Sequence, residues 1–75
     1  MLAGKRFRLR TPTIGVDKTG ESKIAVTIPA GVTIEIVRGP SPNDSMVDVV
    51  WNGRTMVMFI QDIQERGEEV TNQKP

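Results

Sequence analysis

The dipeptide Asn52-Gly53 lies between two runs of alternating apolar and polar residues, and it constrains the fold more than any other feature of the chain. Asn-Gly favours the type I′ turn of a two-residue β-hairpin, because both central positions of that turn need a positive φ. The short loop also sets the register, so Trp51 should oppose Arg54 and Val49 should oppose Met56. The chain is therefore expected to be built on antiparallel β-sheet.

The same period of two recurs elsewhere and predicts further strands. Residues 5–10, 23–28 and 32–37 alternate in this way, and residues 68–70 suit a short last strand. Between residues 61 and 67 the pattern changes to a single helical turn ended by glycine. The predicted core consists of Phe7, Leu9, Ile24, Val26, Ile28, Ile34, Ile36, Val49, Met58 and Ile63.

Length and composition restrict the chemistry. The 75 residues suffice for one domain, expected over residues 1–70 with a disordered tail at 71–75. Cysteine and histidine are absent, which excludes disulfides, thiolate zinc sites and catalysis by Cys–His or Ser–His pairs. No glycine-rich phosphate loop is present, so no cofactor is expected. No apolar run reaches the roughly 20 residues that span a bilayer, and no signal peptide is recognisable, so a cytoplasmic location without membrane contact is expected.

The order of predicted elements resembles that of the SH3-like barrels. Ala30-Gly31 precedes an alternating strand, residues 47–54 resemble the distal hairpin, and residues 61–63 fall at the 3₁₀ turn of that family. The resemblance implies an all-β, five-stranded, partly open barrel with one short 3₁₀ or helical turn near the C-terminus. Tyrosine is absent, and Met46 and Phe59 stand where the peptide groove has its tryptophan and proline, so binding of proline-rich peptides is not expected.

A second resemblance concerns the plasmid-borne, trimethoprim-resistant dihydrofolate reductases, in which four SH3-like barrels surround a central pore. Residues 56–59 are similar in position to the Val-Gln-Ile-Tyr segment that lines the pore in that family. Val57 replaces the glutamine and Phe59 replaces the tyrosine, so the polar groups that would hold folate and nicotinamide are missing. The resemblance implies an alternative function, as a subunit of a symmetric homo-oligomeric enzyme.

One face of the predicted hairpin is more apolar than a solvated face should be. Met46, Val50, Val57 and Phe59 lie opposite the core face, where only Asp48 and Thr55 are polar. Contiguous exposed apolar patches on small domains usually mark an interface, although the curvature of a small barrel can also bury part of both faces. The leading hypothesis is thus a non-catalytic module that binds itself or another protein through these four residues.

A basic row offers a further alternative. Arg6, Arg8 and Arg10 alternate along the first strand, about 6.6 Å apart on one face, and such a row can contact the phosphates of nucleic acid. The C-terminal part of the chain is acidic, however, so the two ends can instead lie together and attract each other. Carboxylates such as Asp62 and Glu65 are typical of a solvated surface, and their spacing predicts no metal site.

Overall fold

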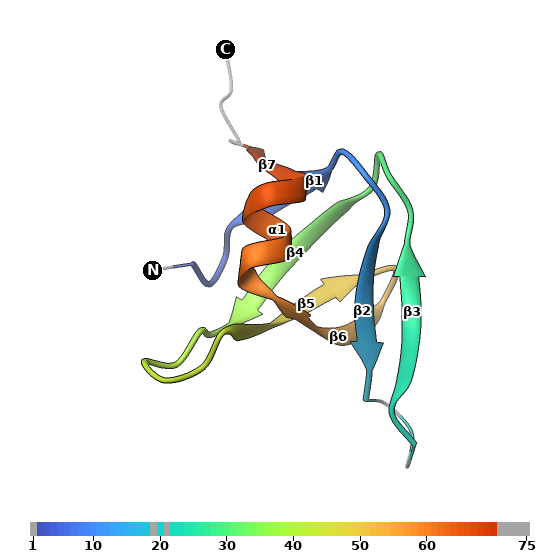
Figure 1. Ribbon diagram of the computed structural model, residues 1–75, viewed down its shortest axis with the longest axis vertical. Coiled ribbons are helices and arrows are strands. Elements are labelled where there is room, and N and C mark those ends of the chain that lie inside the picture. The colour runs from blue at the N-terminus through green and yellow to red at the C-terminus, as the bar shows by residue number, and fades with distance from the viewer. Residues whose placement is uncertain (1, 19, 21, 71–75) are drawn as a thin grey trace.

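Seven antiparallel strands and one short helix form the described part of the chain, which comprises residues 2–18, 20 and 22–70 of the computed structural model (Figure 1). The predicted tail at 71–75 lies outside these residues. The all-β class is confirmed. The elements are β1 (Arg6–Leu9), β2 (Thr13–Asp17), β3 (Ile24–Ile28), β4 (Thr33–Arg38), β5 (Met46–Trp51), β6 (Arg54–Phe59), α1 (Ile60–Arg66) and β7 (Gly67–Val70).

The strands form one sheet in the order β3-β2-β6-β5-β4-β1-β7. The sheet is strongly bent, with the β2–β3 hairpin along one side and β1 and β7 at the other end (Figure 1). It does not close, because β3 and β7 remain at its two ends. The expected five strands are a wrong count: the residues before the predicted strand at 23–28 form an additional strand, β2, which pairs regularly with β3 over five residue pairs.

The central hairpin agrees with its prediction in both turn and register. Asn52 and Gly53 have φ angles of 55° and 74°, as a type I′ turn requires. Trp51 pairs with Arg54, and the ladder continues without interruption to the pair of Met46 and Phe59. The two faces of this hairpin are therefore separated as the alternation predicts.

Strand β2 was not expected, because its pattern is the reverse of an ordinary core strand. Its inward positions are the small residues Thr13 and Gly15, both buried, whereas Ile14 points outward and is 54% exposed. A Cβ on Gly15 would lie 3.0 Å from Ile28 Cδ1 and 3.2 Å from Met56 Sδ. The small inward residues thus let two larger neighbours occupy the space beneath β2.

The C-terminal helix α1 is longer than the single turn expected, and it reaches from β6 to β7. Its Ile63 is fully buried, which anchors the helix on the core. Gly67 follows directly, as predicted, but its backbone is extended (φ −126°) and it begins β7. No helix in the described part of the chain is long and apolar enough to cross a membrane.

The core lies on the concave side of the bent sheet, and most of its predicted members are confirmed. It also includes Val47 and Met56, which the register places on the same face. Val26 packs against the core only in part, and Ile24, 59% exposed, was wrongly assigned to it. Ile24 alternates correctly but stands at the start of the edge strand β3, which has β2 alone beside it among the described strands. The buried hydrophobic residues are Phe7, Leu9, Ile28, Ile34, Ile36, Val47, Val49, Met56, Met58 and Ile63.

Candidate functional site

The outward face of the β5–β6 hairpin brings three of the four predicted interaction residues together. Met46 pairs directly with Phe59, and Val57 lies diagonally across from Met46. Phe59 is 50% exposed, whereas Met46 and Val57 are half-buried. Val50 is half-buried as well, but it pairs with Thr55 towards the hairpin tip and is separated from Met46 by Asp48. The predicted surface is therefore split, with Val50 apart from the rest.

Strand β2 extends this surface with residues that the sequence did not indicate. Val16 pairs with Val57 and is half-buried, and Ile14 points to the same side two residues earlier. A signal was present, because Ile14 and Val16 alternate with the smaller Thr13 and Gly15. The alternation was not recognised as a strand, because in β2 the larger residues face outward and the smaller ones face the core. We call the residues Ile14, Val16, Met46, Val57 and Phe59 the outer apolar face.

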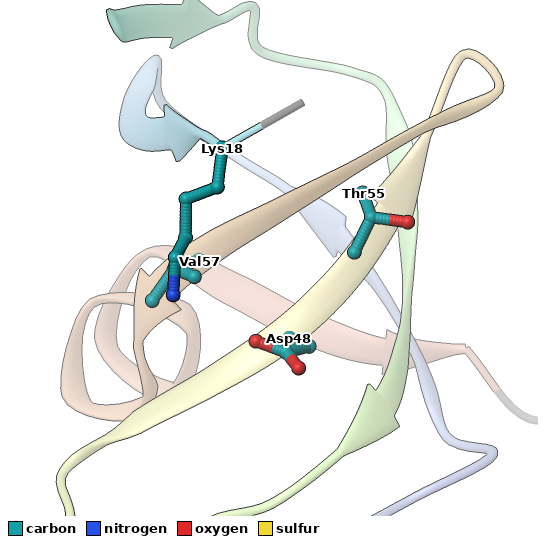
Figure 2. Close-up of a pocket in the computed structure, with 4 residues that line it drawn as sticks. All are labelled: Lys18, Asp48, Thr55 and Val57. Atoms are coloured by element: carbon teal, nitrogen blue, oxygen red, sulfur yellow. The ribbon is translucent and has the colours of Figure 1, made fainter. Parts of the chain in front are cut away.

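Two adjoining hollows lie on this side of the sheet, and both are lined by Lys18 and Val57. One, of about 290 Å³, also has Asp48 and Thr55 in its lining. The other, of about 270 Å³, is completed by Val16, Lys23 and Met46. Figure 2 shows the Lys18 side chain descending from the end of β2 alongside Val57. The shared residues make the hollows neighbouring parts of one depression with an apolar floor.

Charged groups surround this depression without filling it. Lys18 directly follows β2 and Lys23 directly precedes β3, and both side chains are exposed. Asp48 stands on the other side, with its Oδ2 atom 3.8 Å from Nε of Arg38. The depression can therefore receive an apolar group while its lysines contact an anionic one.

The described residues include no cluster of three or more acidic, histidine or cysteine side chains placed to hold a metal ion. Within residues 56–59, compared above with a pore-lining segment, Met56 and Met58 are buried in the core. Only Val57 and Phe59 face outward, and both are apolar. An oligomeric pore lined by this segment would thus present hydrocarbon to a ligand.

Two arginines of the predicted basic row contact the C-terminal segment. Nη2 of Arg8 lies 3.5 Å from Oε1 of Glu68, and Arg10 donates a 2.9 Å hydrogen bond to the carbonyl oxygen of Glu65. Arg6 stands opposite Glu35 in the ladder between β1 and β4. The alternative interpretation, that the chain ends attract each other, agrees with this pairing of β1 and β7. Nucleic-acid contact by the three arginines stays a prediction.

Comparisons with protein-family models, with curated proteins and with solved structures find no significant match to this chain. The SH3-like resemblance therefore stays a prediction drawn from spacing and element order.

Proposed function

We propose that this domain is a non-catalytic interaction module that binds a partner protein through the outer apolar face. The observation that supports it is an apolar surface continuous over β2, β6 and β5 on the side of the sheet opposite the core. An antiparallel sheet with one solvated face normally carries polar residues there. The large exposed fractions of Ile14 and Phe59 make this departure costly unless a partner covers them.

The lining of the depression defines the chemistry of the partner. Its floor of Val16, Met46 and Val57 suits an inserted aliphatic or aromatic side chain, and methionine adapts its shape to such a guest. The ammonium groups of Lys18 and Lys23 on the rim favour carboxylates beside that side chain. The preferred ligand is thus an apolar residue flanked by Asp or Glu in a segment of another protein.

The SH3-like barrel, expected from the element order, belongs to the same proposal. Some members of that fold class bind segments of other proteins, and the resemblance implies that Met46 and Phe59 of the outer apolar face correspond to positions of their peptide groove. The tryptophan and the proline of the groove for proline-rich peptides are replaced here by Met46 and Phe59, so a different ligand chemistry is proposed. The fold contributes a rigid sheet, and the ligand preference comes from these side chains.

Selection from a random peptide library displayed on phage tests the proposal, followed by fluorescence anisotropy on the selected peptides. We expect enrichment of apolar residues with acidic neighbours. The double variant V57E/F59E should weaken binding about tenfold or more, because it places carboxylates on the apolar floor. The matched control T33E/V37E adds the same charge at exposed positions of β4 that are not part of the outer apolar face, and it should bind normally.

Four results would overturn the proposal. A selection without enrichment would contradict it, and so would peptides that bind V57E/F59E as tightly as the unmodified chain. NADPH-dependent reduction of dihydrofolate by the purified protein would contradict the non-catalytic assignment and favour the symmetric enzyme. If V57E/F59E instead dissociates an oligomer of the chain, the face binds a second copy and not another protein.

A further inference from the structure

The two ends of the sheet differ in how they are protected against further strand pairing. Strand β7, at one end, has four residues, and two of them are the charged Glu68 and Glu69. Glu68 forms an ion pair with Arg8 on β1, and Glu69 forms one with Lys5, which directly precedes β1. Charged side chains and short length are the usual protections of an edge strand. The β7 edge is therefore protected in the ordinary way.

Strand β3, at the other end, is of similar length, with five residues, but its own residues carry no protecting charge. Its sequence Ile-Ala-Val-Thr-Ile contains no charge and no proline. The ladder with β2 is regular over all five pairs, so no bulge twists the edge away. In an antiparallel ladder every second residue directs its N–H and C=O groups away from its neighbour. Among the described strands none pairs with this side of β3, so those groups form an open template.

We propose that β3 pairs with β3 of a second copy of this chain, in antiparallel orientation and centred on Val26. The five residues are symmetric in character about that centre. Ile24 would oppose Ile28 of the second copy, Ala25 would oppose its Thr27, and the two Val26 residues would face each other. A shift of the centre in either direction leaves fewer pairs, so this register uses the whole strand.

The burial gradient along β3 supports a second copy as the occupant. On the inward side Ile28 is fully buried, Val26 is half-buried and Ile24 is 59% exposed. The antiparallel register reverses this gradient in the second copy, so that the exposed end of one strand lies beside the covered end of the other. Ile24 then gains the apolar neighbour that its own molecule does not supply, and the two cores continue across the interface.

The charges next to β3 select the antiparallel orientation. Lys18 and Lys23 stand together at one end of the β2–β3 hairpin, whereas Pro29, Ala30 and Gly31 follow the other end of β3. A parallel pair would bring four lysines together at one end. The antiparallel pair separates the two lysine pairs by the length of the strand and places each beside an uncharged loop.

Disulfide cross-linking measures the register directly, because the natural chain contains no cysteine. In the proposed pair the Cα atoms of the two residues at position 26 would be about 4.5–5.5 Å apart. This separation lies within the range of about 4.4–6.8 Å that a disulfide bridges. Under mild oxidation V26C should therefore cross-link to a covalent dimer. The control A25C is more exposed but would sit diagonally from its counterpart, so it should cross-link more slowly.

A charge-swap experiment supplies the second, independent readout. A25K/T27K would place lysines directly opposite lysines, and A25E/T27E would place glutamates opposite glutamates, so neither variant should dimerise. An equimolar mixture should form mixed dimers in light scattering over a concentration series. Ala25 and Thr27 are exposed, so both variants should fold normally. The control V37K/S41K carries the same added charge away from the edge and should dimerise like the unmodified chain.

The proposal is overturned if the unmodified chain stays monomeric at all concentrations, or if A25C cross-links as fast as V26C. Mixing the charged variants without forming dimers would also overturn it. Val57 and Phe59 lie outside β3, so V57E/F59E should leave the V26C cross-link intact. Failure of the edge pairing and failure of the outer apolar face as a peptide site are therefore distinguishable.

Discussion

Replacing Gly67 with alanine should destabilise the fold through one added methyl group. Gly67 is buried where α1 ends and β7 begins, and a Cβ there would lie 2.9 Å from the Ile63 carbonyl oxygen and 3.2 Å from that of Arg8. Both contacts are with backbone, and the Gly67 N–H already donates to the same Ile63 oxygen. Relief therefore requires movement of the helix or of β1. The φ of −126° is accessible to alanine, so the loss of stability should come from the close contacts of the added Cβ and not from backbone strain.

The magnitude follows from two opposing contributions. Overpacking of this kind destabilises a protein by about 1–3 kcal/mol. The alanine also lowers the conformational entropy of the unfolded chain, which stabilises the folded state by about 0.4–1 kcal/mol. The net loss in the free energy of unfolding should be about 1–2 kcal/mol, and a domain of this size then loses about 5–15 °C in Tm.

Urea denaturation followed by the fluorescence of Trp51, the only tryptophan, measures this loss. The control is G20A, because the nearest atom to a Cβ at Gly20 is 4.0 Å away. We expect G20A to be as stable as the unmodified chain or slightly more so. If G67A matches G20A in stability, the junction between α1 and β7 is not as closely packed as the argument requires.

Two further predictions concern the core and the ion pairs. M56A should lower the free energy of unfolding, measured by urea denaturation, by about 2–5 kcal/mol, because Met56 is fully buried and its truncation leaves a cavity. M56L should lower it by less than about 1.5 kcal/mol, because leucine nearly fills the same volume. Equal losses in the two variants would contradict the close packing of Met56 beneath β2. A double-mutant cycle with R8A and E68A should give a coupling free energy below about 1 kcal/mol, and this coupling should decline with added salt, because both side chains are more than half exposed. A larger coupling that does not depend on salt would mean that the ion pair is shielded from solvent.

The candidate site could be predicted from the sequence only in part. The alternation around Asn52-Gly53 correctly placed Met46, Val57 and Phe59 on one face, because both strands of a tight hairpin are local in the chain. The contribution of Val16 could not be read in this way. It depends on the pairing of β2 with β6, two strands far apart in the sequence, and no local pattern encodes that approach.

The sequence by itself determined the hairpin of β5 and β6, its turn and its register, since these follow from the φ preferences of two residues and a period of two. Only the tertiary structure decided which apolar residues are covered. Ile24 and Ile28 occupy equivalent positions in the alternation of β3, yet one is 59% exposed and the other fully buried. Burial depends on atoms brought from distant segments, and at the edge of an open sheet those atoms are present at one end of the strand and missing at the other.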